Sequence, residues 1–389
     1  MNKKIAVLGA TGSVGTQALD VARSRGYTVD LLTADSNVAL METLCREFSP
    51  KVAVMANNAA GSDLAVRLSD TTVKVLCGTS AIPEAISASC ADVVVNSILG
   101  EAGLMPTLAT IDCGKRLALA NKESLVIAGD IVMSRLTEKG GELIPVDSEH
   151  CAIFQSLKAG RPAEVKRIIL TASGGPFYGY SCEELETVTL ADTLAHPTWK
   201  MGKKITVDSA TLMNKGFEVI EAVHLFGVSA ERVDVTVHRE SILHSAVEYI
   251  DNSIIGEFSV PDMRMCVQYA VDYPDRRVSS GESLDLFSVG KLTFAKPDTD
   301  AFPLLALAKR AIDAGGGMPA VLNASDEIAV AAFLGEKIRF TDIARVVEAT
   351  YERMYDARHA LDLDSIIAAD RMARGISEEI ITAIAKGRN

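Results

Sequence analysis

The stretch Ile5-Ala6-Val7-Leu8-Gly9-Ala10-Thr11-Gly12-Ser13-Val14-Gly15 decides the fold of the first third of the chain. Its apolar start predicts a strand, its glycines predict a tight turn, and the amphipathic pattern over 14–25 predicts a helix. Glycines in this context let the backbone approach a pyrophosphate, which lies against the amides of the helix N-terminus. The alternative is an ordinary strand–turn–helix with packing glycines. We favour dinucleotide binding, with contacts from Gly9, Thr11, Gly12, Ser13 and Val14.

The same pattern recurs along the first third of the chain, where short apolar runs alternate with amphipathic stretches. Strands are predicted at 5–8, 29–33, 52–55, 73–76, 93–97 and 117–120, with helices between them that include 14–25, 39–48 and 102–113. Alternation of this kind is typical of a parallel sheet with helices on both faces. The fold class is therefore α/β, with an N-terminal Rossmann-like dinucleotide domain.

The pattern changes after about residue 143. Strand-like runs at 165–170, 233–237, 246–249 and 253–258 have long polar connections, which indicates a central α+β domain. Helical patterns follow at 302–314, 325–335, 340–355 and 362–385, the last expected to be broken. We predict a dinucleotide domain over 1–147, a catalytic domain over 148–272, a linker over 273–300 and a helical domain over 301–389. The irregular stretch at about 173–204 is too long for a passive connector and predicts a flexible functional loop.

Composition narrows the class of protein. The 389 residues are 48% hydrophobic and 23% charged, which is typical of a globular chain, and the net charge of −12 argues against nucleic-acid or anionic-membrane binding. No apolar run reaches the roughly 18 residues of a membrane span, and the first strand begins too early to leave room for a signal peptide. Seven scattered cysteines without a CxxC pair indicate reduced thiols in a cytoplasmic protein.

The end of the second predicted strand normally selects the nicotinamide cofactor. An acidic side chain there binds the ribose hydroxyls of NAD, and a basic side chain accommodates the phosphate of NADP. Here the chain reads Asp35-Ser36-Asn37, with no Lys or Arg beside Asp35. The residues by themselves favour NAD, unless Asp35 points away into solvent.

An acidic pair follows another predicted strand, in Pro145-Val146-Asp147-Ser148-Glu149-His150. On an extended segment, Asp147 and Glu149 would face the same side, which suits a hard cation such as Mg²⁺ or Mn²⁺. A surface pair without a metal is the alternative. Glu218, with Glu221 close by in sequence, offers a further carboxylate, and the absence of Cys/His spacing favours oxygen ligands over a zinc site. We expect His150 to be structural.

Polar side chains of the middle region are of the types that bind a phosphate monoester. They are Ser173, Ser209, Asn214 and Lys215, with His196 as a further candidate. The only tryptophan, Trp199, lies in the irregular stretch. It could cover a ligand and exclude water, or it could be packed under the loop.

Several longer motifs together resemble the 1-deoxy-D-xylulose 5-phosphate reductoisomerase family. They span about residues 5–345 and are Gly9–Gly15, Leu119–Ser124, Pro145–His150, Ser173–Phe177, His196–Glu218, Pro261–Arg264 and Leu322–Glu327. The resemblance implies conversion of 1-deoxy-D-xylulose 5-phosphate to 2-C-methyl-D-erythritol 4-phosphate, in isoprenoid biosynthesis by the non-mevalonate route. It implies a skeletal rearrangement followed by reduction with NADPH, assisted by Mg²⁺ or Mn²⁺, with Co²⁺ as a further alternative, in a homodimer without nucleic-acid or membrane partners.

The resemblance also assigns roles to individual residues. Metal ligands would be Asp147, Glu149 and Glu218, and catalytic residues would be Lys122, Glu149 and His196. The sugar phosphate would contact Ser148, Ser173, His196, Trp199, Ser209, Asn214, Lys215 and Glu218. The cofactor would contact the glycine-rich turn together with Asn37, Asn121, Lys122, Glu123, Met201 and Gly202.

Asp35-Ser36 departs from the family pattern, in which a basic residue often follows the second strand. NADPH remains the expected cofactor, because the other motifs are intact, and NADH is the alternative. The competing enzyme class is a semialdehyde dehydrogenase, which would need Cys151 or Cys113 as an activated nucleophile. A non-catalytic dinucleotide sensor with a protein partner is the third alternative.

Overall fold

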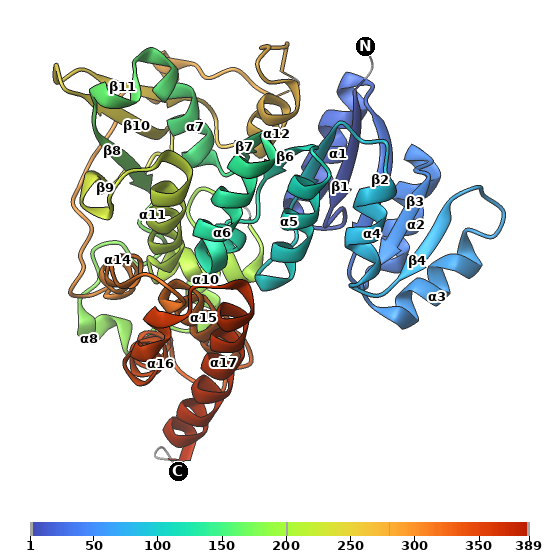
Figure 1. The fold of residues 1–389 in the computed structure, drawn as a ribbon. Helices are drawn as coiled ribbons and strands as arrows, with labels where there is room; N and C mark the ends of the chain where they lie inside the picture. The colour runs from blue at the N-terminus through green and yellow to red at the C-terminus, as the bar shows by residue number, and fades with distance from the viewer. Residues whose placement is uncertain (1–2, 200, 280, 387–389) are drawn as a thin grey trace. The chain divides into compact units, whose positions relative to one another are not determined.

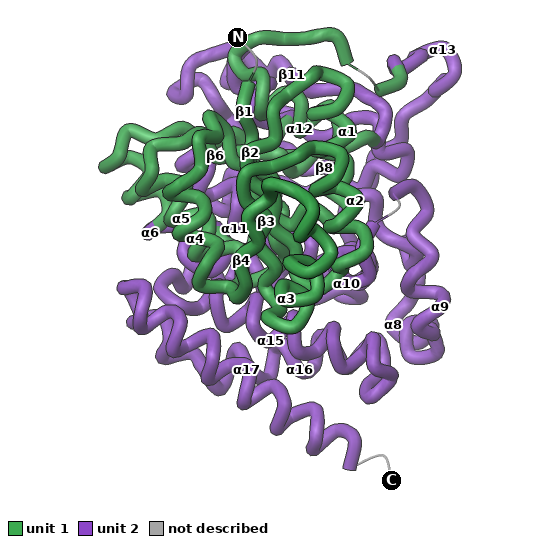
Figure 2. The backbone as a smooth tube through the Cα atoms, turned by 90° about the vertical axis from the view of Figure 1, so that its right-hand side faces the viewer, with its two compact units in different colours: residues 1–124, 132–151, 262–282 green, residues 125–131, 152–261, 283–389 purple. Residues whose placement is uncertain are grey.

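The computed structural model describes residues 3–199, 201–279 and 281–386. Lys200, Ser280 and the chain ends, which fall within the predicted loop, linker and terminal domains, lie outside the described residues. The chain divides into two compact units (Figure 2): unit 1 is Met1–Ser124, Val132–Cys151 and Asp262–Glu282, and unit 2 is the remainder. The four functional segments expected from the sequence stay a prediction.

Unit 1 contains a seven-stranded sheet in the order β4-β3-β2-β1-β5-β6-β7, with every neighbouring pair parallel. Its strands are β1 Lys4–Leu8, β2 Thr28–Ala34, β3 Val52–Met55, β4 Lys74–Cys77, β5 Val93–Asn96, β6 Arg116–Leu119 and β7 Leu143–Pro145. Ala6, Leu31 and Val94 are fully buried in its core. The strand order changes direction between β1 and β5, and ligands bind at such a switch point in open α/β sheets. The predicted Rossmann-like fold is confirmed.

Helices cover both faces of this sheet, as Figure 1 shows, and all of them except α12 lie between its strands along the chain. They are α1 Ser13–Arg25, α2 Val38–Phe48, α3 Asn58–Arg67, α4 Ala81–Ala88, the 3₁₀ turn η1 Glu101–Gly103, α5 Leu104–Asp112, α6 Glu123–Lys139 and α12 Met263–Asp272. Helix α12 packs on α1 although about 240 residues of chain separate them, which explains why 262–282 belong to unit 1. Ala128 interrupts α6 with a non-helical backbone, and 125–131 belong to unit 2.

Unit 2 contains a four-stranded sheet in the order β11-β10-β8-β9, in which only β8 and β9 are parallel. Its strands are β8 Val165–Ala172, β9 Val233–Val237, β10 Leu243–Tyr249 and β11 Ile254–Phe258. Its helices are α7 Ser148–Ser156 (which begins in unit 1), α8 Cys182–Leu185, α9 Leu190–Thr193, α10 Lys203–Ala210, α11 Met213–Phe226, α13 Leu286–Val289, α14 Leu304–Ala314, α15 Met318–Leu334, α16 Phe340–Arg353 and α17 Leu363–Lys386. Four 3₁₀ turns complete it, η2 Leu157–Ala159, η3 Pro162–Glu164, η4 Ala230–Arg232 and η5 Tyr355–His359.

Two of the C-terminal helices differ from expectation. The helix expected to be broken is continuous over Leu363–Lys386, because a buried stripe that includes Ile366, Ala373 and Ile380 packs along α15 and α16. Helix α15 begins at Met318 rather than 325, because 318–324 are all buried and therefore lack the polar face that an amphipathic pattern requires. The predicted linker carries the short helix α13 and an antiparallel bridge between Val237 and Ala295.

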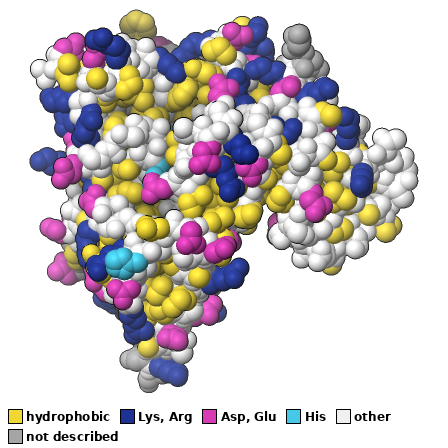
Figure 3. Space-filling view, viewed as in Figure 1, with side chains coloured by type: hydrophobic (Ala, Val, Ile, Leu, Met, Phe, Trp, Pro, Cys, Tyr) yellow, Lys and Arg dark blue, Asp and Glu magenta, His cyan; other side chains and the backbone are white. Residues whose placement is uncertain are grey.

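The surface carries mixed charge. Figure 3 shows basic and acidic side chains interspersed over the visible face. No helix within the described residues combines the length and the apolar character that crossing a membrane requires.

Candidate active site

The glycine-rich turn between β1 and α1 has a shape that only glycine permits. Gly9 has a φ of +78°, and a Cβ on Gly15 would lie 2.2 Å from the Gly9 carbonyl oxygen. Gly12 caps α1 without a side-chain hydrogen bond, and Gly12 and Ser13 are exposed. The first amides of α1 are therefore open to an anionic group, as a pyrophosphate requires.

The segment after β2 is exposed from Asp35 to Asn37. The Ser36 hydroxyl donates a hydrogen bond to the Asp35 carboxylate at 3.0 Å. The Asn37 side chain caps α2 by accepting from the Leu40 N–H. Asn37, a predicted cofactor contact, therefore also has a local structural role, and Asp35 is free to face a ligand or solvent.

Asn121 organises the loops at the carboxyl ends of β5 and β6. Its buried side-chain nitrogen donates to the carbonyl oxygens of Ile98 and Gly100 and to the Glu123 carboxylate. The neighbouring Lys122 ammonium lies 2.7 Å from a carboxylate oxygen of Asp147, and both side chains are largely buried. Of the predicted cofactor contacts here, Asn121 and Glu123 are occupied in holding the loops, while Lys122 reaches the acidic segment after β7.

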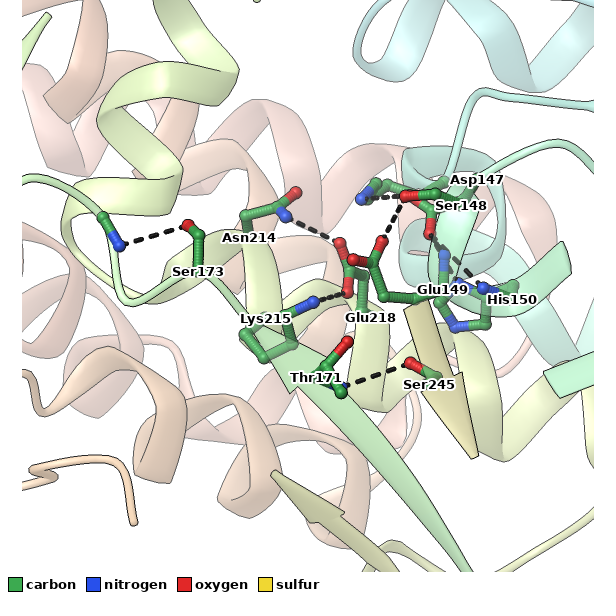
Figure 4. A network of polar contacts seen from close by, with 12 residues as sticks. Asp147, Ser148, Glu149, His150, Thr171, Ser173, Asn214, Lys215, Glu218 and Ser245 are labelled. Atoms are coloured by element: carbon green, nitrogen blue, oxygen red, sulfur yellow. Dashed lines mark hydrogen bonds and ion pairs between the residues drawn. The ribbon is translucent and has the colours of Figure 1, made fainter. Parts of the chain in front are cut away.

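The acidic segment is helical rather than extended, which corrects the expected geometry. Helix α7 begins at Ser148, and the Asp147 carboxylate accepts from the Glu149 N–H at 3.1 Å. The Ser148 hydroxyl donates to Glu149, and Asp147 accepts from the His150 ring (Figure 4). Burial opposes ionisation of Asp147, but Lys122 and His150 outweigh it and hold the pKa of the carboxyl well below its ordinary value. The carboxylate is therefore ionised at neutral pH.

In unit 2, the first two turns of helix α11 carry Asn214, Lys215 and Glu218. Leu212, which precedes α11, has a φ of +61°, a strained conformation for a branched side chain. In the next turn of helix, the Asn214 amide donates to Glu218 at 2.6 Å, and the buried Lys215 ammonium pairs with the other Glu218 oxygen (Figure 4). The Glu218 carboxylate, 1% exposed, is thus supported from two sides.

The irregular segment after β8 brings Ser173 and His196 together. The Ser173 hydroxyl lies 2.9 Å from Nε2 of His196 and also accepts from the Gly175 N–H. Nδ1 of His196 accepts from the backbone N–H of Trp199 at 3.0 Å. Burial, with the nearby Arg239 guanidinium, lowers the pKa of His196 to about 4, so the ring is neutral at pH 7.

The remaining predicted contacts lie at the C-terminal end of this segment and in α10. The Trp199 indole packs edge-on against the ring of the buried His244, with ring centroids 6.0 Å apart. Met201 is half-buried, and the exposed Gly202 caps α10, where Ser209 is half-buried. The segment is not wholly irregular, because α8 and α9 lie within it, each with a capping box.

Arg239 and His244 were not among the site residues expected from the sequence. Arg239 donates to the carbonyl oxygens of Ser173 and Gly175, and His244 contacts Trp199. A signal was present: the run from His238 to Ser245 carries two histidines and an arginine directly after a strand, an unusual density of polar side chains. Of the two candidate nucleophiles for a semialdehyde dehydrogenase, Cys151 is 1% exposed, which argues against it, and Cys113 is half-buried at the end of α5.

Comparisons with known proteins cover nearly the whole chain. Family models match at 5–129 (1-deoxy-D-xylulose 5-phosphate reductoisomerase), at 143–226 (its C-terminal domain) and at 258–376 (DXP reductoisomerase C-terminal domain). A 1-deoxy-D-xylulose 5-phosphate reductoisomerase of Acetivibrio thermocellus is 50% identical over 98% of this chain and 100% of its own. One of Caldanaerobacter subterraneus subsp. tengcongensis is 48% identical over 96% and 97% of the two chains.

Solved structures agree with these sequence relatives. The Zymomonas mobilis enzyme in complex with NADPH has a TM-score of 0.91 and 42% identity, with 98% of this chain and 99% of that chain covered. A DOX-P reductoisomerase in complex with NADPH, fosmidomycin and magnesium has a TM-score of 0.93 and 38% identity, at the same coverage. On this likeness in sequence and fold, the chain belongs to the 1-deoxy-D-xylulose 5-phosphate reductoisomerase family.

Proposed function

We propose that this protein converts 1-deoxy-D-xylulose 5-phosphate to 2-C-methyl-D-erythritol 4-phosphate, by a skeletal rearrangement followed by reduction with NADPH. The observation that carries the proposal is the 50% identity to a reductoisomerase over 98% of the chain. The reaction belongs to isoprenoid biosynthesis by the non-mevalonate route. It requires a hydride donor, a group that polarises the substrate oxygens, and a cationic pocket for the phosphate.

The glycine-rich turn fits the nicotinamide cofactor. Gly9–Val14 would hold its pyrophosphate, because the uncapped start of α1 offers amide donors and the turn leaves no room for side chains. Met201 would lie near the nicotinamide, which supplies the hydride. The NADPH complex of a relative that is 42% identical supports this choice of cofactor. The exposed Asp35 is the feature that favours NADH.

Asp147, Glu149 and Glu218 are the proposed ligands of one divalent cation, with Mg²⁺ or Mn²⁺ preferred and Co²⁺ an alternative. The donor chemistry supports a hard cation, since every ligand is a carboxylate and each is positioned by hydrogen bonds within its own unit. The cation would act as a Lewis acid on vicinal substrate oxygens. Magnesium in the complex of a relative that is 38% identical also supports the choice.

The substrate phosphate would bind to Ser173, Ser209, Asn214 and Lys215, whose hydroxyl, amide and ammonium groups are strong donors to anionic oxygens. Ser148 would bind a substrate hydroxyl, and Trp199 would cover the bound substrate and exclude water. Lys122 would place a positive charge between substrate and cofactor. Binding the phosphate away from the reacting carbons provides free energy for closing the segment that carries His196.

The test is the oxidation of NADPH, and separately of NADH, followed by absorbance with 1-deoxy-D-xylulose 5-phosphate in the presence and absence of Mg²⁺. Metal-dependent oxidation with formation of 2-C-methyl-D-erythritol 4-phosphate is the expected result. A folded protein that oxidises neither cofactor, with Mn²⁺ also tried, would overturn the proposal and favour the sensor alternative. Cys151→Ala should keep its activity, whereas the semialdehyde dehydrogenase alternative requires its loss.

We also propose that the protein is a cytoplasmic homodimer. Support comes from apolar side chains that are exposed in unit 2: Ile254 and Phe258 on the edge strand β11 are 57% and 46% exposed, and Phe287 is 99% exposed. Edge strands with exposed apolar side chains tend to pair with another chain. Light scattering should give twice the chain mass of 41.4 kDa, and a mass of one chain at micromolar concentration would overturn the proposal.

A further inference from the structure

Hydrogen bonds to several segments anchor the connection between β9 and β10. The buried His238 accepts at Nε2 from the N–H groups of Ile242 and Leu243. The backbone N–H of His238 donates to the Ala172 carbonyl at 2.7 Å, and the Glu240 carboxylate accepts from the N–H and hydroxyl of Thr293. Arg239 lies between His238 and Glu240, and the contacts of these two neighbours restrict where it can lie.

Arg239 binds two carbonyl oxygens of the turn that follows β8. One terminal nitrogen donates to Ser173 at 2.8 Å and to Gly175 at 2.6 Å, and the guanidinium lies 5.2 Å from the centre of the Tyr178 ring. Hydrogen bonds from a charged donor are among the stronger ones in proteins. Among the residues that the structure describes, no acidic side chain pairs with Arg239. Its positive charge is therefore not neutralised locally.

The Ser173–Gly175 turn, whose carbonyl oxygens accept from Arg239, can take its shape only with glycine. Gly174 and Gly175 have φ values of +76° and +63°, and a Cβ on Gly175 would lie 2.9 Å from the Ser209 carbonyl oxygen. Because the peptide is planar and trans, a Ser173 carbonyl directed at Arg239 turns the Gly174 N–H to the opposite side. Over 3–199, 201–279 and 281–386, that N–H has no hydrogen-bond acceptor. It remains available to a ligand.

The hydrogen-bond partners of the Ser173 hydroxyl also leave a donor available to a ligand. Because Nδ1 of His196 accepts from the Trp199 N–H, the ring hydrogen of the neutral histidine is on Nε2, which donates to Ser173. The Gly175 N–H donates to the same oxygen. A hydroxyl has one hydrogen to donate and accepts two, so the Ser173 hydrogen is the one left for a ligand oxygen. The hydroxyl hydrogen and the Gly174 N–H are both donors suited to an anion.

We propose that Arg239 is a positioning residue for the phosphate of the substrate: it fixes the Ser173–Gly175 turn so that the turn presents its donors to an anion, and it adds an uncompensated positive charge beside them. This inference rests on the proposed function, since it concerns the phosphate end of the same substrate. Arg239 is not one of the predicted phosphate contacts, and the proposal gives it a share of the affinity for the phosphate.

The test compares Arg239→Met, Arg239→Lys and, as a matched control, Arg353→Met on α16, where Arg353 is 57% exposed. Trp199, the only tryptophan, reports the binding of inorganic phosphate by its fluorescence, without requiring turnover. KM for 1-deoxy-D-xylulose 5-phosphate, KM for NADPH and kcat are measured in parallel. Thermal unfolding shows whether each variant folds, and Arg239→Gln provides the same comparison if Arg239→Met does not.

Arg239→Met should weaken phosphate binding and raise KM for the sugar phosphate by about tenfold, as expected for losing charge-assisted hydrogen bonds, with KM for NADPH unchanged. Arg239→Lys should restore most of the binding, because one nitrogen makes both contacts. Wild-type binding in Arg239→Met, or no recovery in Arg239→Lys, would overturn the inference. Arg239-dependent phosphate binding without turnover would instead overturn the proposed function alone.

Discussion

At the scale of single residues, Glu218 combines a structural and a proposed chemical role. Its two carboxylate oxygens accept from Asn214 and Lys215, so the side chain is fixed before any cation binds. Glu218→Gln keeps the size of the side chain but removes the negative charge that a hard cation requires. We expect kcat to fall by roughly 100-fold or more, because metal ions contribute several kcal/mol to such reactions. Binding of NADPH, measured by its fluorescence, should remain.

The control for this variant is Glu352→Gln, whose carboxylate is 57% exposed and pairs with Arg310 on the surface. It should have wild-type kinetics. Full activity of purified Glu218→Gln would remove Glu218 from the metal site.

At the same scale, we expect Asp35 and Ser36 to influence the preference between NADPH and NADH. Both are exposed at the end of β2, where their hydrogen bond leaves an anionic side chain beside the expected ribose site. Replacing Asp35 with Gly and Ser36 with Lys removes a charge that repels the phosphate of NADPH and adds one that attracts it. The ratio of kcat/KM for NADPH to that for NADH should rise by about tenfold. Asp35→Asn alone separates the lost repulsion from the new attraction, and an unchanged ratio in the double variant would contradict the prediction.

At the scale of elements, the segment between β8 and α10 has an anchored first part. Phe177 is buried and packs edge-on against Phe340, and Glu186 pairs with Arg345 of α16. The part that carries His196 and Trp199 has fewer buried side chains. We infer that closure over a ligand involves this second part, since α8 and α9 are attached to the helical core.

Trp199→Ala tests that closure. Removing the indole takes away its contact with His244 and its proposed cover over the substrate. KM for 1-deoxy-D-xylulose 5-phosphate should rise by roughly two- to tenfold, the range expected from the loss of one aromatic contact, and KM for NADPH should not change. Trp199→Phe should keep most of the affinity. Wild-type kinetics in Trp199→Ala would mean that the indole has only a packing role.

Secondary structure was predictable from the sequence where burial follows a simple period. Strands β1, β3 and β9 match their predicted bounds within a residue, because each is a short run rich in apolar or β-branched residues. The start of α7 was not, because Asp147 caps a helix at Ser148 whereas an acidic pair also suits a strand. The break expected in α17 is absent because contacts with α15 and α16 outweigh the low helix propensity of Gly375.

At the scale of the whole molecule, the candidate site residues were predictable only where they belong to long motifs. Those motifs named Ser173, His196 and Lys215, and each has polar partners in unit 2. Arg239 contacts Ser173 across 66 residues of sequence, and His244 contacts Trp199 across 45 residues. Such contacts depend on the pairing of β8 with β9 and β10, which no local pattern encodes. The family motifs therefore predict candidate ligand contacts, whereas the contacts of Arg239 and His244 with these residues emerge only from the structure.

The buried histidines should make the free energy of unfolding of the whole molecule depend on pH. Burial is the main cause that lowers the pKa of His244 to about 4, while its Nε2 lies 3.2 Å from the Ser259 carbonyl. In the unfolded chain a histidine has a pKa of about 6.5. Above that pH both states are neutral and the histidine costs nothing; between about 6.5 and 4 only the unfolded state takes up the proton, so stability falls as pH falls.

From pH 7 to pH 5, His244 should therefore lower the free energy of unfolding by about 2 kcal/mol, and the half-buried His196 should add a smaller loss. His244→Gln can still donate to Ser259 but does not titrate, so its loss over this interval should be smaller by about that amount. Urea unfolding followed by circular dichroism at the two pH values measures the difference. His359→Gln, at an exposed histidine, is the control and should behave as wild type. Equal losses in wild type and His244→Gln would show that His244 takes up its proton inside the folded protein, because a group that titrates alike in both states cannot make stability depend on pH.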